Sequence, residues 1–342
     1  MDGYAIRLEE LGGVVLPVIG TIPAGAPPRH LPPGTAMRIF TGAPVPTEAT
    51  CVVRREDTRE SPNEVLIQVA ASTLKFGQNI RRRGENSPMG SVILPAGTLL
   101  TPTSVAAVAT FGSRELNVRR RVRVVVLTTG DELIDAGKAC EDWQIHDSNG
   151  PSLEAWLRQQ SWIELVARKH IGDTLEKVEA AIAAHLPLAD AILLSGGVSM
   201  GDADYVPDAI QRLGGEVAFH GLPIRPGKPA LGASLNGKLL LGLPGNPVSV
   251  AVTSRVIGLP LLQILAGMAP LQTNSFLATI ANPDEKMLPL HWFRLIAKVV
   301  NNDVFLMTSL GSGDIVSLAQ SVGFIEILPS SRGPGPWQFT YW

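Results

Sequence analysis

Residues 121–266 constrain the fold most, because apolar runs of strand length alternate there with longer stretches of helical pattern. Such alternation is typical of parallel βαβ units with helices on both faces of a sheet. We therefore predict a central three-layer α/β domain over 121–266. Its strand candidates are RVRVVVLTTG, IELVARKHI, ADAILLSGG, EVAFHGL and KLLLGLPG, and its helix candidates are SNGPSLEAWLRQQ, GDTLEKVEAAIAAHL opened by Asp173, ADYVPDAIQRLGG and NPVSVAVTSRVIG.

The flanking regions show other patterns. Residues 1–86 place short β-branched runs between clusters of proline and glycine, which predicts a β-rich domain with tight turns. Residues 87–120 contain PTSVAAVATFG, a short helix after a proline start, and we read this region as a linking helical segment. Residues 267–342 return to short strand-like runs and predict a C-terminal β domain, with the tail SSRGPGPWQFTYW as irregular coil.

Composition excludes several classes of protein. The chain is 45% hydrophobic and 18% charged, so it should fold, and a net charge of −2 argues against a nucleic-acid partner. Cys51 and Cys140 form neither a disulfide framework nor a zinc spacing, which suits a reducing cytoplasm. Residues 248–271 are apolar but interrupted by Arg255, Pro260 and Gln263, so we expect a core helix there and no membrane partner.

Polar residues gather where the predicted strands end. In a parallel α/β sheet, ligands bind at the carboxyl ends of the strands, so residues that follow the strands should meet at one edge. One strand is followed by TTGDEL, another by SGGVSMGDAD and a later one by GLPGNPVS, and the loop IRPGKPA lies between them. We expect convergence there of Asp131, Glu132, Asp202, Asp204, Arg225 and Lys228.

These residue types suit a phosphorylated or nucleotide-like substrate with a divalent metal. Adjacent Gly196 and Gly197 would let backbone N–H groups approach an anion, and Lys228 and Arg225 would neutralise it. Carboxylate oxygens suit Mg²⁺. Structural alternatives stay open, since the glycines could form a turn, Asp131 and Asp202 could cap helices, and PGNP could be a rigid turn. A Walker A motif and a strand-linked GxGxxG are missing, which argues against ordinary ATPase and dinucleotide-binding functions.

Taken together, the motifs resemble the molybdopterin molybdenumtransferase family, and the chain is similar to the related E domain of gephyrin. The resemblance runs in order along nearly the whole chain. Its motifs are MDGYA (1–5), RIFTGAPVPTEATCVVRRED (38–57), RRRGEN (81–86), LTTGDEL (127–133), IHDSN (145–149), SGGVSMGDADYV (195–206), RPGKP (225–229) and GLPGNPVS (242–249), with GSGDIVSLAQSVGFIEILP a weaker match.

The resemblance implies a fold and a reaction. The fold is a molybdopterin-binding α/β domain with flanking β-rich domains and a helical linker, in an elongated homodimer. The reaction takes adenylylated molybdopterin and molybdate, cleaves the pyrophosphate link, releases AMP and places molybdenum on the dithiolene, with Mg²⁺. Implied partners are a molybdopterin adenylyltransferase and molybdoenzyme targets. Tungstate resembles molybdate so closely in charge and shape that the sequence does not separate the two anions.

The resemblance also implies a set of site residues. Asp2 and Thr41 match family residues that reach the partner subunit's pocket, and Arg225 and Lys228 match a loop that holds an oxyanion or phosphate. Carboxylates beside two anionic ligands would be unfavourable without a metal ion between them. The implied catalytic residues are Asp2, Thr41, Glu132, Asp173, Asp204 and Lys228; the implied substrate- or anion-binding residues are Ser195, Gly196, Gly197, Ser199, Arg225, Pro244, Gly245, Asn246, Arg294 and Ser312; the implied metal ligands are Glu132, Asp202 and Asp204.

Three departures from the family pattern leave two alternative functions open. The usual segment before the DGYA motif is missing, Asn86 stands where the family commonly has Asp, and QSVG (320–323) differs from the usual pattern. One alternative is molybdopterin adenylylation, although the flanking β domains argue against it. The other is a non-catalytic binding or scaffold protein of the same fold.

Overall fold

The computed structural model describes every residue except 11–14, 200, 202–203 and 269–274. Asp202, one of the predicted metal ligands, therefore lies outside the described residues. The chain forms two compact units, Met1–Ile93 and Leu94–Trp342, which are described separately. The finer boundaries at residues 86, 120 and 266 stay predictions.

The first unit is a six-stranded sheet in the order β4-β1-β3-β2-β6-β5. Its strands are β1 (Gly3–Ile6), β2 (Val15–Ile22), β3 (Ala36–Ile39), β4 (Cys51–Arg54), β5 (Thr58–Glu60) and β6 (Glu64–Ile67). Both β3 and β4 pair with β1 in antiparallel fashion. Gly3 is required there, since a Cβ atom would collide with the Val53 carbonyl oxygen on β4. The DGYA motif thus begins an inner strand of this sheet, next to the edge strand β4.

The second unit begins with α1 (Pro102–Thr110), which starts after Thr101 as predicted from its proline. The central sheet follows, in the order β10-β7-β11-β15-β14-β12. Its strands are β7 (Val122–Thr129), β10 (Ile163–Ile171), β11 (Ala191–Ser195), β12 (Glu216–His220), β14 (Leu231–Leu235) and β15 (Lys238–Leu243), with a small separate pair β8 (Leu133–Ile134) and β9 (Ile145–His146).

Only part of the central sheet is parallel, which corrects the prediction of βαβ units throughout. Strands β10, β7, β11 and β15 run parallel, but β14 is antiparallel to both β15 and β12. The reason is the two-residue turn Asn236–Gly237, where both residues have positive φ angles, 50° and 72°. Such turns join antiparallel neighbours in hairpins, so the chain folds straight back from β14 into β15.

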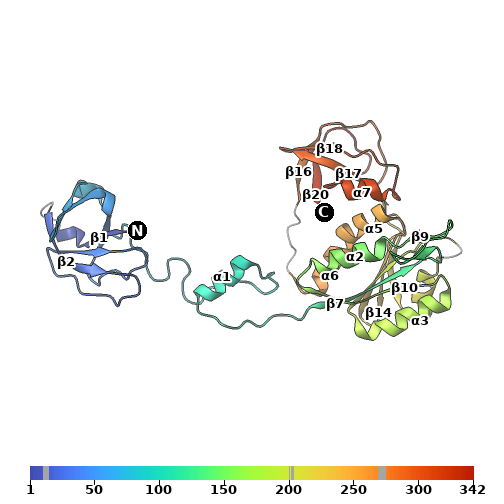
Figure 1. Ribbon diagram of the computed structural model, residues 1–342, viewed down its shortest axis with the longest axis horizontal. Coiled ribbons are helices and arrows are strands. Elements are labelled where there is room, and N and C mark those ends of the chain that lie inside the picture. The colour runs from blue at the N-terminus through green and yellow to red at the C-terminus, as the bar shows by residue number, and fades with distance from the viewer. Residues whose placement is uncertain (11–14, 200, 202–203, 269–274) are drawn as a thin grey trace. The chain divides into compact units, whose positions relative to one another are not determined.

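Helices cover both faces of the sheet, which confirms the three-layer prediction (Figure 1). Residues of α3 (Leu175–His185) and α4 (Val206–Arg212) pack on one face, around Val125 and Ile192. Residues of α2 (Asn149–Arg158), α5 (Pro247–Thr253) and α6 (Leu259–Leu265) pack on the other, around Val124 and Leu193. Asp173 does not cap α3; the Thr174 hydroxyl does, because it accepts a hydrogen bond from the Lys177 N–H.

The continuous helix Pro247–Leu265 is long and apolar enough to cross a membrane by length and composition alone. In this fold, α5 and α6 are joined by a π-helical turn, Ser254–Gly258, and Val250 and Leu262 pack into the sheet core. This packing is typical of a core helix in a folded domain.

The last sheet has the order β13-β17-β18-β16-β20-β19 and carries α7 (Ile315–Gln320). Its strands are β13 (Ile224–Arg225), β16 (Ser275–Ile280), β17 (His291–Val300), β18 (Asp303–Leu306), β19 (Gly323–Ile327) and β20 (Trp337–Tyr341). The predicted irregular tail is wrong, since β20 pairs with both β16 and β19. β13, which precedes β14 in the chain, pairs with β17, and a shared core of Ile224, Val252 and Phe293 joins the two sheets.

Candidate active site

The carboxyl ends of β7, β11 and β15 open into two adjoining cavities of about 1080 and 600 Å³. We call the larger the acidic cavity, because Glu132, Asp147, Asp173 and Asp204 line it. We call the smaller the basic cavity, because Arg225, Lys228, Lys286 and Arg294 line it. The two share a wall of Ser199, Pro229, Pro244, Gly245 and Asn246. The described site residues of this unit that the resemblance implies thus line one or both of two cavities at one end of the sheet.

The Gly196–Gly197 turn ends β11 and lines the acidic cavity. Both glycines have positive φ angles, 93° and 65°, and a Cβ atom on Gly196 would lie 2.5 Å from the Thr129 carbonyl oxygen. The Gly196 N–H donates to the Leu243 carbonyl at 3.2 Å, so this N–H serves the fold. The turn interpretation is confirmed, and it places the glycines at the cavity as well.

Two carboxylates that line the acidic cavity, Asp173 and Asp204, are held by backbone N–H groups. Asp173 accepts from the Asp131 N–H at 3.2 Å, and Asp131 accepts from the Asp173 N–H at 3.1 Å. Asp204 accepts from the Gly201 N–H at 2.8 Å, and its own N–H donates to the Gly201 carbonyl. Neutral donors hold these side chains in place without cancelling their charge, so the carboxylates keep their capacity for a cation.

The sequence reasoning missed two residues of the IHDSN motif as part of the site. The Asn149 side-chain amide donates to the Ser195 hydroxyl at 3.0 Å and to the Gly245 carbonyl at 2.6 Å, which ties α2 to two loops of the cavity. Asp147 is buried, accepts from the Gly150 N–H at 2.8 Å and lies 3.6 Å from the Arg168 guanidinium. A run of polar residues directly before a helix was the signal that could have revealed them.

Lys228 lies in a loop that is fixed by backbone hydrogen bonds within the loop and to its neighbours. The Lys228 carbonyl accepts from Leu222 at 2.8 Å, and the Ala230 N–H donates to the Gly227 carbonyl. Gly227 has a φ angle of 110°, and a Cβ atom there would collide with the Thr253 methyl group on α5. Arg225 was expected in a loop, but it lies on the short strand β13, which pairs with β17 of the C-terminal sheet.

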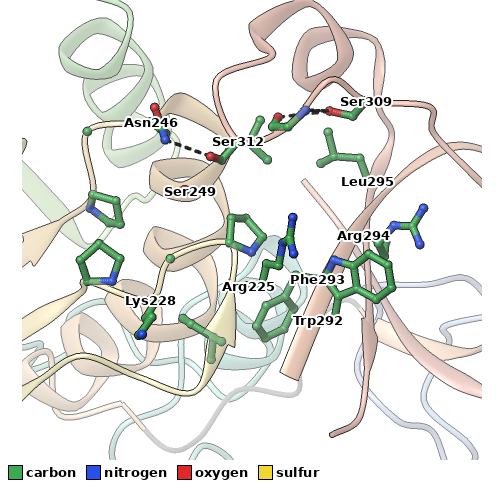
Figure 2. A pocket seen from close by; sticks show the side chains of 18 of the residues that line it. Arg225, Lys228, Asn246, Ser249, Trp292, Phe293, Arg294, Leu295, Ser309 and Ser312 are labelled. Atoms are coloured by element: carbon green, nitrogen blue, oxygen red, sulfur yellow. Dashed lines mark hydrogen bonds between the residues drawn. The ribbon is translucent and has the colours of Figure 1, made fainter. Parts of the chain in front are cut away.

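The opposite wall of the basic cavity comes from the C-terminal sheet (Figure 2). Arg294 on β17 bonds to Asp284 at 2.7 Å and stacks over the Trp292 ring, 4.2 Å from its centroid. The Lys286 ammonium lies 5.4 Å from the same ring centroid. The Ser312 hydroxyl accepts from the Asn246 amide at 2.9 Å, which links the PGNP loop to this wall. Lys286 and Trp292 were not identified from sequence.

Each of the two cavities is lined by both paired and unpaired charges. Arg294 has a carboxylate partner, Asp284. In the part of the chain that the structure describes, Arg225, Lys228, Glu132 and Asp204 have no ion-pair partner. Unpaired charges of opposite sign on two sides of a thin wall suit a ligand with its own anionic groups and a metal ion.

The donor set of the acidic cavity fits Mg²⁺ that arrives with a phosphate. Among the described residues, no three His, Cys, Asp or Glu side chains form a group that could cage a metal. Magnesium, however, usually keeps several waters and binds through one or two carboxylates plus substrate phosphates. Glu132 and Asp204 line one cavity and supply two such carboxylates.

Asp2 and Thr41 meet in the first unit. One Asp2 carboxylate oxygen accepts from both the Thr41 N–H, at 2.9 Å, and the Thr41 hydroxyl, at 3.0 Å. These two hydrogen bonds, the backbone one foremost, hold the pKa of Asp2 below its usual range. The pair is therefore preformed as an ionised carboxylate beside a hydroxyl, and its part in the reaction stays a prediction.

Comparisons with known proteins agree with this architecture. Residues 1–112 match the family described as "MoeA N-terminal region (domain I and II)", and residues 125–264 match the "Probable molybdopterin binding domain". Among solved structures, the molybdopterin biosynthesis moeA protein of Pyrococcus horikoshii aligns with the whole chain and 86% of its own, with a TM-score of 0.74 at 28% identity in one crystal structure and 0.81 at 24% in another.

Curated relatives carry the name molybdopterin molybdenumtransferase. The chain is 36% identical to that of Nostoc over 79% of its length and 63% of the relative's. It is 38% identical to molybdopterin molybdenumtransferase 2 of Mycobacterium tuberculosis (78% and 68%), and 30% identical to that of Staphylococcus aureus (97% and 81%). The chain thus spans between about three fifths and four fifths of these relatives. Fold, motifs and relatives together show that this chain belongs to the molybdopterin molybdenumtransferase family.

Proposed function

We propose that the chain transfers molybdenum from molybdate to adenylylated molybdopterin and releases AMP, in a Mg²⁺-dependent reaction. The names of the curated relatives support this reaction. The observation that carries the proposal is the pair of adjoining cavities, one with unpaired carboxylates and the other with unpaired cations. Binding a molybdate dianion needs cationic side chains, and binding a pyrophosphate together with Mg²⁺ needs carboxylates, so the two substrates need opposite charges at different places.

The basic cavity is the proposed oxyanion site. Lys228 and Arg225 would attract an anion without losing an internal partner, and Lys228 stands on a loop fixed by its own hydrogen bonds. Ser312 and Asn246 would add a hydroxyl and an amide as neutral donors or acceptors. Because Arg294 is already paired with Asp284, we propose that it mainly stabilises the wall of the cavity and attracts the bound anion more weakly than Lys228 does.

The acidic cavity is the proposed site of the pyrophosphate and Mg²⁺. When bound, the ion would neutralise phosphate oxygens and so ease the departure of AMP. Glu132 and Asp204 would hold it, while Asp173 is fixed by its exchange of hydrogen bonds with Asp131. The shared wall of Pro244 and Gly245 would let one substrate touch both cavities.

We further propose that the protein is a cytoplasmic homodimer.

The test is AMP release from adenylylated molybdopterin by purified protein, measured by chromatography, with molybdate and Mg²⁺ varied independently. The proposal expects AMP release that needs both. No AMP from folded protein would favour a binding or scaffold role. Adenylylated product formed from ATP and molybdopterin without molybdate would favour the adenylyltransferase alternative. Light scattering of the same sample would test the proposed dimer.

A further inference from the structure

A third cavity, of about 320 Å³, lies between α2, α5 with its π-helical turn, and α7. It shares no lining residue with the acidic or basic cavity. Its walls are mostly apolar, with Leu153, Val250, Leu318 and Trp342 among them. Of the sequence motifs, only the weaker C-terminal match reaches it, through Leu318, Ala319 and Ser321, and the proposed function makes no use of it. It is large enough for a small organic ligand.

Arg255 is the one charged residue among the described residues that line this cavity. It lies in the π-helical turn Ser254–Gly258, a distortion that is frequent at functional sites. Its guanidinium stacks over the Trp156 ring at 5.7 Å from the centroid, and no carboxylate within the described part of the chain pairs with it. Burial alone lowers the pKa of Arg255. A half-buried cation thus lacks an anion.

Trp156 supplies a second donor without an acceptor. Its side chain is 6% exposed, and its indole Nε1 is buried with no hydrogen-bond partner among the described residues. A buried donor left unpaired costs about 1–3 kcal/mol, so native proteins seldom leave one without a reason. Among the described residues, the other buried side-chain nitrogen without a hydrogen-bond partner is Arg123 Nε. It lies 3.9 Å from the Asp190 carboxylate, which balances the charge of the arginine. The Trp156 ring lines the cavity, but its Nε1 is closed to solvent, so the charged donor open to a ligand there is Arg255.

We propose that this cavity binds a small organic carboxylate, with Arg255 as its counter-ion and the apolar walls, the Trp156 ring among them, around its carbon body. A carboxylate has only acceptors, which matches a guanidinium. The described lining contains no Asp, Glu, His or Cys, so a metal ion has no ligands there. A single cation between apolar walls also suits a monovalent acid with an apolar body better than a phosphate dianion.

The experiment is calorimetric titration of the full chain with benzoate, with benzamide and inorganic phosphate as matched probes. We expect benzoate to bind at least about tenfold more tightly than either. Arg255→Met keeps the length of the side chain and should weaken benzoate at least about tenfold, because it removes a charged hydrogen bond worth about 1.5–3 kcal/mol. Trp156→Phe keeps an aromatic wall and should change benzoate affinity by less than about threefold.

Two further measurements distinguish this site from the basic cavity. Lys228→Ala should leave benzoate affinity unchanged, since Lys228 does not line this cavity. Benzoate should raise the Tm of the wild type but not of Arg255→Met, and the ligand-free variant should be at least as stable as wild type because an unpaired cation is gone. Equal binding of benzoate and benzamide, wild-type affinity in Arg255→Met, or loss of binding in Lys228→Ala would each overturn the proposal.

Discussion

Both ends of the central sheet carry charged residues, but those at the amino ends are paired with one another whereas several at the carboxyl ends are not. At the amino ends of β7, β11 and β15, Asp190 bonds to the Arg120 guanidinium at 2.5 and 2.8 Å and accepts from the Arg123 N–H, with Lys238 at 3.6 Å. At the carboxyl ends, Lys228, Glu132 and Asp204 have no such partners within the described residues.

We infer that the paired charges at the amino ends stabilise the fold, whereas the unpaired charges at the carboxyl ends bind a ligand. The amino-end network cross-links the starts of three strands, and its Asp190 side chain is only 14% exposed. At the carboxyl ends, Asp204 is positioned by the Gly201 N–H and Lys228 by its own loop, so the scaffold fixes both without neutralising them. Substitutions at the amino ends should therefore lower the free energy of unfolding, and substitutions at the carboxyl ends should lower the rate of turnover.

The largest effect is expected for Lys228→Ala. This change removes an unpaired cation from the basic cavity, and loss of one such stabilising group typically lowers turnover by roughly 10²–10³-fold. The AMP-release assay measures this loss, and unfolding curves should stay within ~0.5 kcal/mol of wild type. Lys169→Ala, at an exposed position on β10, is the matched control and should behave as wild type. A Lys228 variant with normal turnover would contradict the placement of the oxyanion site.

Asp204→Asn should have the next largest effect, about 10²-fold on turnover, because a charged magnesium ligand becomes neutral. The asparagine oxygen can still accept from the Gly201 N–H, so the turn should survive. The variant should also need more Mg²⁺ for half-maximal AMP release. Asp208→Asn, exposed in the first turn of α4, is the control. An unchanged magnesium requirement would remove Asp204 from the metal site.

Asp190→Asn should act on stability instead, with a loss of about 2 kcal/mol in the free energy of unfolding. The bond to Arg120 holds the pKa of Asp190 far below its usual range. A lowered pKa stabilises the fold fully above the unfolded value near ~4 and loses that stabilisation as the pH falls through the folded value. Denaturant titrations from about pH 5 to pH 2 should therefore fall more steeply for wild type than for the variant. Parallel curves would show that Asp190 is not a stabilising carboxylate.

The smallest effect is expected for Ser312→Ala, which removes the hydroxyl that accepts from Asn246. The backbone bond from the Val248 N–H to the Ser312 carbonyl at 3.0 Å remains, so the two walls stay joined. Turnover should fall about three- to tenfold, in line with about 1 kcal/mol for a neutral hydrogen bond. Ser309→Ala, on the same wall but bonded only within its own turn, should change less. The reverse order would indicate that Ser309 is the substrate contact.

Local patterns in the sequence predicted most of the central domain. The alternation of apolar runs and helical stretches was enough for β7, α2, β10, α3, β11 and α4, each at its expected place. The strand LGASL was missed because glycine and small residues weaken its pattern, although the Asn236–Gly237 turn beside it was a readable signal. The loops of Glu132 and Asp204 could be placed because a parallel sheet brings strand ends together.

The remaining site residues depend on tertiary contacts that no local pattern carries. Arg225 joins the basic cavity through the pairing of β13 with β17, in which Ile224 lies opposite His291, 67 positions later in the sequence. Lys286 and Trp292 reach it only because the C-terminal sheet packs on α5. The ion pairs at the amino ends could not be predicted either, since in the sequence Asp190 and Arg120 resemble ordinary surface charges beside strands.

The most direct test compares two lysines at opposite ends of this sheet, Lys228 and Lys238, each changed to alanine. AMP release and the free energy of unfolding are measured on both variants under the same conditions. We predict that Lys228→Ala loses turnover with near-normal stability, whereas Lys238→Ala loses stability, by up to ~1 kcal/mol, with near-normal turnover. Equal effects of the two changes on both quantities would contradict the division of the sheet into a structural end and a ligand-binding end.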